Sequence, residues 1–356
     1  MQNLRCTKNG YLQMKKSLLL ILFILVFQSC SKSNKVENVE HAFYYWKSDN
    51  WRLSENEKKI IDSQNVSKLY VKFFEVEHND LMGNIPVSKN NLSIYSKENY
   101  SIIPCVYIRN EVFLKSKKEE LDVLADNIIF LINKKKEEHL RDVEEINEIQ
   151  MDCDWTLKSK ENYFYFLTKL KQIYKKKISC TLRLYPYKYP EKMGIPPVDK
   201  ATLMCYNLIN PLEDKSKNSI LDTNELSKYL NKNRKYPLHL DIALPVYSWM
   251  QLFQNNEFTK VIYTDFEKIK PILKPVKPLW FEVTKDITIA DVYLRIGDKI
   301  KYDEITAKEI KKAIEIIKKN VNFDKQTTIS LFHLDEEQLK QYSNEEISSF
   351  YSLFTE

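Results

Sequence analysis

Along most of the chain, short apolar stretches alternate with longer stretches whose apolar positions recur every three to four residues. The short stretches are typical of β-strands, and the longer ones are typical of amphipathic helices. A chain in which strands alternate with helices favours parallel βαβ units. The stretches that fit strands are residues 42–46, 68–76, 101–108, 145–155, 177–185, 201–207, 238–249 and 327–334.

The number of these units predicts the fold class. Eight βα units around one core predict an α/β fold, a (β/α)8 barrel of the TIM type, over residues 42–356. An open doubly wound sheet is the alternative, but the chain has only 4 Gly and lacks the Gly-rich first turn of such sheets. The stretch between the seventh and eighth strands is too long for an ordinary loop. We therefore expect a small α/β insertion there, at about residues 255–325.

The N-terminal segment has the pattern of a signal peptide. Lys15 and Lys16 precede the apolar run "SLLLILFILVF", which is short for a transmembrane span and ends in "QSC" at Cys30. A Cys at this place resembles the lipobox of bacterial lipoproteins, which implies cleavage before Cys30 and a lipid on its sulfur. We expect a signal peptide at 1–29, a lipidated tether at 30–41 and a lipid-anchored location outside the cytoplasm, in the cell envelope. A plain secretory signal or an uncleaved anchor is the alternative.

Composition narrows the possible partners. The 55 Lys+Arg and 49 Asp+Glu leave a net charge of +6 that is scattered along the chain, so we expect no nucleic-acid partner. No phosphate-binding Gly motif and no HxH or HExxH spacing occurs, so we expect neither a cofactor nor a metal. We expect a monomer. Buried thiols are expected inside four apolar runs, although an oxidising compartment leaves a disulfide open; these are Cys105, Cys153, Cys180 and Cys205.

The fourth expected strand has one polar and one apolar face. Because side chains alternate along a strand, an apolar face that packs on helices leaves the polar face inside the barrel and at its C-terminal mouth. Carboxylates two residues apart also raise each other's pKa, which suits acid–base chemistry. A solvated strand end with one structural Asp is the alternative. The polar set is Glu148, Gln150, Asp152, Asp154 and Thr156; the apolar set is Met151, Cys153 and Trp155.

Other strands are expected to point polar and aromatic side chains at the same mouth. Strand seven places Tyr247 at the mouth and Asp241 deeper, on the same face. Strand five ends with Arg183 and Tyr185, strand one ends with Trp46, and strand two offers Lys72 or Glu75, depending on its register. Aromatic rings at a barrel mouth can stack on sugar faces. Ordinary core or rim packing, with Arg183 paired to an aspartate, is the alternative.

Three motifs resemble those of family-18 glycoside hydrolases, the chitinase-like barrels. The fourth-strand motif of that family, DGxDxDWE, is matched by "IQMDCDWT", in which Asp152, Asp154 and Trp155 agree. The sixth-strand motif MxYD is matched by "MCYN" at 204–207, and the seventh-strand GLPxYG is matched by "ALPVYS" at 243–248. The third-strand SxGG has no match. The resemblance implies a barrel with a glycan partner.

The departures from these motifs concern catalysis. In the family, the Glu that ends DxDxE protonates the glycosidic oxygen while the neighbouring Asp holds the attacking N-acetyl group. Thr156 occupies that Glu position, Ile149 and Gln150 replace the first Asp and the Gly, and Asn207 replaces the sixth-strand Asp. A threonine hydroxyl is too weak an acid near pH 7 to replace a carboxylic acid. The sequence therefore predicts glycan binding without the usual mechanism. The residues expected to bind are Trp46, Asp152, Asp154, Arg183, Tyr185, Tyr206, Asn207 and Tyr247.

Two rival interpretations stay open. The first is an active glycoside hydrolase with a relocated carboxylate, in which the catalytic candidates are Asp152, Asp154 and Asp241. The second is a structural or protein-binding lipoprotein. Direct sugar binding separates the glycan-directed interpretations from the structural one, and release of reducing ends separates hydrolysis from binding.

Overall fold

The computed structural model describes residues 36–47, 52–87, 100–140, 145–213, 215–230, 235–262, 264–289 and 291–356. Residues 36–356 form one unit. The expected signal peptide, Cys30 and the tether up to residue 35 lie outside the described residues. Within the described ranges, no helix has both the length and the apolar character needed to cross a membrane.

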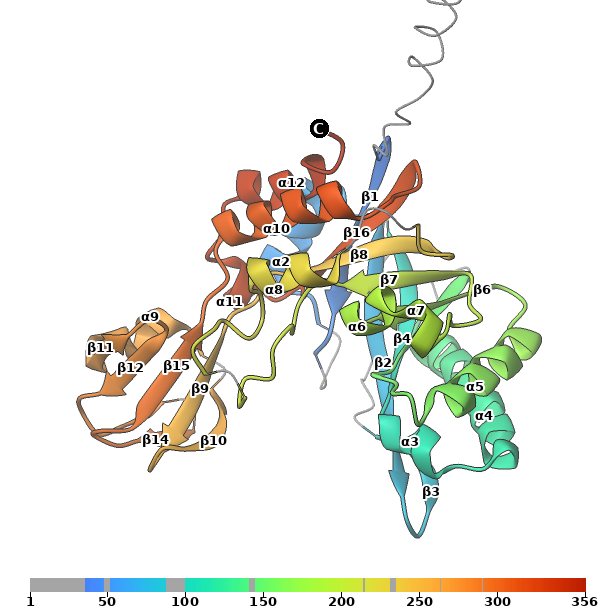
Figure 1. The fold of residues 1–356 in the computed structure, drawn as a ribbon, viewed down its shortest axis with the longest axis horizontal. Helices are drawn as coiled ribbons and strands as arrows, with labels where there is room; N and C mark the ends of the chain where they lie inside the picture. Colours follow the sequence, from blue (N-terminus) through green and yellow to red (C-terminus); the bar gives the residue numbers. More distant parts are fainter. Residues whose placement is uncertain are drawn as a thin grey trace, which may run out of the picture. The chain divides into compact units, whose positions relative to one another are not determined.

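Eight parallel strands of the described residues close into a barrel (Figure 1). Their order is β1-β16-β8-β7-β6-β5-β4-β2, and β1 also pairs with β2, which closes the ring. The predicted (β/α)8 barrel is thereby confirmed. The strands are β1 (Asn38–Tyr45), β2 (Lys68–Asn79), β4 (Ser101–Ile108), β5 (Glu148–Asp152), β6 (Lys177–Leu182), β7 (Lys200–Met204), β8 (His239–Pro245) and β16 (Gln326–Phe332).

Helices connect these strands along the outside of the barrel (Figure 1). In α10, Ile310, Ala313, Ile314 and Ile317 recur at helical spacing and are all fully buried. A short strand, β3 (Gly83–Val87), extends β2 as an antiparallel hairpin. The helices are α2 (Glu55–Ser63), α3 (Asn110–Lys115), α4 (Lys118–His139), α5 (Lys160–Ile173), α6 (Leu184–Lys188), α7 (Pro190–Met193), α8 (Thr223–Tyr229), α10 (Ala307–Asn320), α11 (Glu336–Leu339) and α12 (Asn344–Ser352).

Several element boundaries differ from the sequence prediction. The first strand begins at Asn38, inside the expected tether, because it pairs with β16 from that residue onward. The fourth strand ends at Asp152, so that Asp154 and Thr156 lie in the following loop. The sequence pattern predicts one C-terminal helix over about residues 336–353, but the structure has two, because Ser343 caps a new N-terminus by accepting a hydrogen bond from the Glu346 N–H.

The insertion between β8 and β16 is an antiparallel sheet of five strands with a small core of its own, within the described residues. It begins at Trp249 and ends at Asp303, whereas 255–325 was expected. The helix α10 packs its apolar face into the core of the barrel and so belongs to the barrel. The insertion contains β9 (Trp249–Gln254), β10 (Glu257–Ile262), α9 (Phe266–Ile269), η1 (Lys270–Ile272), β11 (Leu273–Lys277), β12 (Trp280–Val283), β13 (Ile287–Ile289), β14 (Val292–Leu294) and β15 (Lys299–Asp303).

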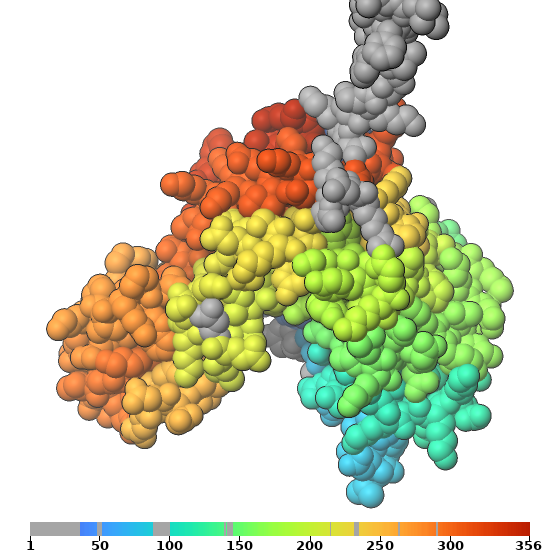
Figure 2. Space-filling model, in the orientation of Figure 1, coloured from blue at the N-terminus to red at the C-terminus, as the bar shows by residue number. Residues whose placement is uncertain are grey.

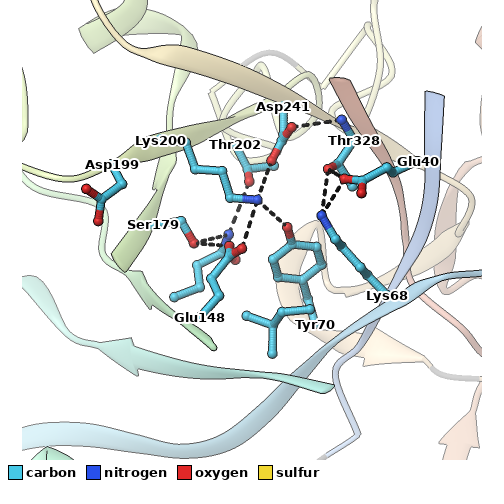
Figure 3. Close-up of polar contacts among 12 residues, drawn as sticks. Glu40, Lys68, Tyr70, Glu148, Ser179, Asp199, Lys200, Thr202, Asp241 and Thr328 are labelled. Atoms are coloured by element: carbon cyan, nitrogen blue, oxygen red, sulfur yellow. Dashed lines mark hydrogen bonds and ion pairs between the residues drawn. The ribbon is translucent and has the colours of Figure 1, made fainter. Parts of the chain in front are cut away.

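The barrel interior near the N-terminal ends of the strands contains a buried network of charges (Figure 3). The Lys200 ammonium lies 3.0 Å from Glu148 and 2.8 Å from Asp241, and it donates to the Tyr70 hydroxyl at 3.1 Å. A second pair, Lys68 and Glu40, is joined to the Thr328 hydroxyl. Barrels of this type usually fill such layers with branched aliphatic side chains. Here the layer is held by ion pairs instead.

The network keeps Asp241 charged inside the protein. Burial acts to raise the pKa of Asp241, but the Lys200 ammonium, the His239 ring and the Thr328 N–H hold that pKa below its usual range. Burial likewise opposes the charge of Lys200, yet Asp241 and Glu148 raise its pKa. Each buried charge is therefore stabilised by a partner of opposite sign.

Above this layer, Gln150 connects four strands. Its side-chain oxygen accepts a hydrogen bond from the Tyr44 hydroxyl at 2.7 Å, and its amide nitrogen donates to Thr202 at 3.1 Å and Ser179 at 3.4 Å. Gln150 is fully buried, so these bonds satisfy a side chain that would otherwise be costly inside the barrel. Gln150, which stands where the DGxDxDWE motif has its Gly, thus fills part of the barrel interior.

We expect Lys200→Met to lower the free energy of unfolding by about 3–5 kcal/mol, because it leaves Glu148 and Asp241 buried without their cation. Guanidinium denaturation followed by circular dichroism measures this, with an unchanged m-value. The control is Lys228→Met, which removes a lysine whose side chain is 62% exposed and pairs with Glu225 at the surface; this change should cost about 1 kcal/mol or less. Equal costs for the two variants would contradict a structural role for the network.

Candidate functional site

Asp152 stands at the C-terminal end of β5, where a barrel of this type carries its site. The Thr181 hydroxyl of β6 donates a hydrogen bond to its carboxylate at 2.6 Å. Burial, together with the negative charge of Asp154, raises the pKa of Asp152 to about 7 against the opposing effects of Thr181 and Arg183. The carboxyl group is therefore about half protonated near neutral pH.

Asp154 follows the strand and is ion-paired. Its carboxylate lies 3.2 Å from Nε of Arg183, and its side chain is 54% exposed. Arg183 also donates to the backbone oxygen of Asn207 at 3.4 Å, which links the ends of the fourth, fifth and sixth barrel strands. The sequence thus placed Asp152 and Asp154 correctly inside and at the mouth of the barrel, and the alternative of an Arg183–aspartate pair also holds.

A cleft of about 680 Å³ opens beside Asp154. Volumes of this size are typical of sites for small ligands. Its walls come from the loop after β5, from the end of β6 with α6, and from the start of α3. Among the residues that line this cleft are Asp154, Thr156, Arg183, Tyr185, Leu114 and Met193.

Thr156 is exposed at the wall of this cleft and lies in the loop between β5 and α5, three residues before the N-cap Ser159. Its N–H donates to the Ser159 hydroxyl at 2.9 Å, and its own hydroxyl lies 3.3 Å from the same oxygen. Ser159 in turn donates to the side chain of Asn110 at 2.5 Å. Thr156 is therefore held in the turn that precedes α5, whereas an alternating strand up to this residue was expected.

A group of aromatic rings surrounds Phe332 at the end of β16, on the other side of the barrel mouth. The ring of Phe332 lies 5.2 Å from Tyr206, 5.7 Å from Tyr247 and 5.7 Å from Trp46, measured between ring centroids. The Tyr247 hydroxyl donates to the side-chain oxygen of Asn207 at 2.6 Å. Three predicted aromatic residues are thus brought together around one residue, Phe332, that the sequence reasoning did not single out.

Asn207 has an unusual backbone conformation. Its φ is 53°, in the left-handed region that Asn tolerates better than most residues. Its N–H donates to the Ile220 oxygen at 2.7 Å, which holds the loop after β7 across the mouth. An Asn at the family's Asp position therefore suits this local turn as well as the contact with Tyr247.

Strand β2 contains a bulge that answers the question of its register. The pairing with β4 shifts between Lys72 and Phe74, and this shift turns both Lys72 and Glu75 toward the same side. Their side chains form an ion pair at 2.8 Å, and the Lys72 ammonium lies 5.7 Å from the ring of Trp46. A bulge adds one residue to a strand, which a strict period of two does not foresee.

Two further groups at this end of the barrel escaped the sequence reasoning. Burial and the negative charges of Asp154 and Asp152 raise the pKa of Tyr107, on β4, to about 12. Burial, with help from the Lys47 and Lys72 ammonium groups, lowers the pKa of His333 to about 4 against the effect of Asp335, and its Nδ1 atom has no hydrogen-bond partner among the described residues. His333 directly follows β16, and this position at the C-terminal end of a barrel strand was the signal in the sequence that could have identified it.

The structure does not bring all the predicted residues together. Tyr185 lines the cleft with Asp154 and Arg183, whereas Tyr206, Tyr247 and Trp46 belong to the aromatic group around Phe332. Asp241 lies in the charged layer near the opposite end of the barrel, paired with Lys200. Among the described residues, no cluster of His, Cys, Asp and Glu side chains could hold a metal ion. The four predicted buried thiols are free and buried.

Comparison with known proteins finds similarity in fold. No protein-family model and no curated protein matches the sequence. Among solved structures, the spore cortex-lytic enzyme SleL of Bacillus cereus is 13% identical, with a TM-score of 0.47 over 86% of this chain and 75% of that one. A chitinase of Chromobacterium violaceum is 10% identical, with a TM-score of 0.49 over 88% of this chain and 99% of that one.

A chitinase-like lectin from tamarind is also similar, with 9% identity and a TM-score of 0.44 over 88% of this chain and 99% of that one. These similarities concern the fold. The chain's own closed ring of strands establishes the barrel.

We expect Asp152→Asn to stabilise the protein at pH 8 relative to the unchanged chain. The folded-state pKa of Asp152, about 7, lies above the unfolded value of about 3.9. The folded state therefore binds more protons between these values, and the unchanged chain loses stability as pH rises through that window. The gain of the variant should grow from near zero at pH 4 to on the order of 2–4 kcal/mol at pH 8. Denaturation at several pH values measures it.

The matched control is Asp154→Asn, which removes the charge next to Asp152. This change should move the midpoint of the Asp152 titration below pH 7, as followed by the NMR signal of its carboxyl carbon. A titration near pH 4 in the unchanged chain would contradict the expected burial of Asp152.

Proposed function

We propose that this protein is a lipid-anchored protein of the cell envelope whose barrel binds glycans at its C-terminal mouth and does not cleave them by the mechanism of the chitinase-like family. The fold alone cannot decide this, because one fold serves many functions. The proposal therefore rests on the side chains at the mouth.

Glycan binding is supported by the combination of aromatic rings and polar groups. The exposed ring of Tyr185 and the partly exposed rings of Trp46 and Phe332 offer apolar faces of the kind that pack on sugar rings, whereas Tyr206 and Tyr247 are buried. Asp154, Arg183 and Asn207 offer hydrogen-bond donors and acceptors between them. A few polar groups in a largely apolar cleft are the usual composition of a ligand site.

The observation that carries the proposal is that Thr156 stands at the place of the family's catalytic Glu. This supports the absence of the usual hydrolysis. The residue at the place of the family's proton donor is a threonine whose hydroxyl and N–H both contact Ser159 in the turn that precedes α5. The nearby carboxylates Asp154 and Glu75 are held in ion pairs with Arg183 and Lys72. Neither is placed as an acid beside Thr156.

A second candidate function is hydrolysis with a relocated acid, and one observation favours it. Asp152 has a pKa of about 7, which is the range that suits a general acid. Its side chain is buried and accepts a hydrogen bond from Thr181, so little of the carboxyl group is open to a substrate. We therefore rank this candidate second.

The anchor is proposed from the sequence alone. The run "SLLLILFILVF" followed by "QSC" supports lipid attachment at Cys30. A tether from Cys30 to the first strand would hold the barrel at the membrane surface. We also propose that the protein is a monomer.

We expect calorimetry to detect binding of an N-acetylglucosamine hexasaccharide, and Tyr185→Ala to weaken it about fivefold or more through the loss of one stacking ring. The control is Tyr293→Ala, which removes a tyrosine of similar exposure on β14 of the insertion and should leave the affinity unchanged. No binding of any glycan in a broad panel would overturn the proposal and favour a structural lipoprotein.

We expect no release of reducing ends from the same hexasaccharide by the unchanged protein. Thr156→Glu would supply the missing carboxylic acid, but Ile149 and Asn207 still depart from the family pattern, so any recovered rate should stay about 100-fold or more below that of an ordinary glycosidase. Ready hydrolysis by the unchanged protein that is lost in Asp152→Asn would establish the second candidate instead.

We expect Cys30→Ala to prevent lipid attachment. In cells, the variant should keep its signal segment or appear in the soluble fraction, whereas the unchanged protein should partition into detergent and incorporate labelled fatty acid. If the variant shows the same labelling and processing as the unchanged protein, the anchor lies elsewhere.

A further inference from the structure

The outer wall of the cleft carries more positive than negative charge. In residues 154–161 and 183–193, which contain the β5–α5 loop and the helices α6 and α7, the sequence has five cations and three carboxylates. Two of the cations have carboxylate partners within this group, because Arg183 pairs with Asp154 at 3.2 Å and Lys160 lies 3.6 Å from Glu161. The other cations are Lys158, Lys188 and Lys192.

These three lysines have no carboxylate partner among the described residues. Lys158 lines the cleft itself. Lys192 donates to the Tyr185 hydroxyl at 3.1 Å, and Lys188 lies 5.1 Å from the centre of the Tyr189 ring and 5.6 Å from that of Tyr229. Lys158 thus lies at the cleft, Lys192 is joined to it through the Tyr185 hydroxyl, and Lys188 is held against the neighbouring Tyr189 ring. None of the three is in an ion pair within the described residues.

The same wall exposes a pair of tyrosine rings. Tyr185 and Tyr189 are 41% and 38% exposed, and their ring centroids lie 4.9 Å apart. Figure 2 shows the light-green segment of α6 and α7 at the surface of the molecule. Rings that solvent can reach, next to unpaired ammonium groups, combine a surface for sugar faces with a surface for anions.

From this combination we propose that the outer wall is a subsite for an acidic glycan, a saccharide that carries carboxylate groups. The tyrosines pack against the sugar rings, and Lys158, Lys188 and Lys192 pair with the carboxylates. The inference rests on the proposed glycan-binding function and adds the charge of the ligand. It concerns the part of the cleft beyond Asp154 and Arg183.

The test compares three hexasaccharides of equal length by calorimetry. One is neutral, built of N-acetylglucosamine; one is acidic, with glucuronate alternating with N-acetylglucosamine; and one is cationic, built of glucosamine. We expect the acidic hexasaccharide to bind about tenfold more tightly than the neutral one at about 50 mM salt, and the cationic one to bind most weakly. The preference should shrink at about 300 mM salt, because the ammonium groups are solvent-exposed.

The double variant Lys188→Gln, Lys192→Gln should reduce the acidic preference to about twofold. A double variant on α10, Lys312→Gln with Lys319→Gln, changes the net charge by the same amount away from the cleft and should keep the full preference. If the acidic and neutral hexasaccharides bind equally well, the subsite is refuted and the proposed glycan binding stands.

Other outcomes separate the remaining possibilities. A preference that survives in the Lys188, Lys192 variant would also refute the subsite, because the charge recognition would then lie elsewhere. Equally tight binding of a glutamate hexapeptide would refute the glycan specificity and leave a general anion-binding surface. If none of the three hexasaccharides binds, both the subsite and the proposed function fail.

Discussion

The barrel depends on a lysine that sits where barrels of this type usually place aliphatic side chains. Lys200 joins Glu148 of β5 to Asp241 of β8, so that three strands share one buried cation. Two carboxylates this deep would repel each other and would be costly to bury alone. With the ammonium between them, the layer instead fixes the positions of the strands, because a buried ion pair tolerates little change in distance.

This layer has consequences at the opposite end of the same strands. Glu148, Gln150 and Asp152 share one face of β5, so a strand held by Lys200 at its beginning and by Gln150 in its middle presents Asp152 at its end. The barrel can therefore keep Asp152 in a buried place where its pKa is about 7. The charged layer and the mouth thus lie at opposite ends of the same strand, β5.

At the mouth, side chains that would be needed for catalysis have structural partners. Thr156 is bonded to Ser159 in the turn before α5, Asn207 accepts a hydrogen bond from the Tyr247 hydroxyl in a left-handed turn, and Arg183 pairs with Asp154. These contacts are among the observations that support the proposed glycan binding. The cleft opens next to Asp154, and residues 154–158 of the loop after β5 form part of its wall.

The sequence by itself determined the barrel, the inward face of β5 and the aromatic residues of strands six and seven, because period-two patterns and the order of strands and helices are local properties of the chain. It did not determine that Glu148, Lys200 and Asp241 would meet, because no local pattern records which side chains face one another across a barrel. It also missed Phe332 at the centre of the rings and left open the choice between Lys72 and Glu75. Only the tertiary structure decided three further features, because each arises from packing between distant segments. They are the bulge in β2, the pairing of Asp154 with Arg183 in the loop after β5, and the neighbours of Lys188 and Lys192.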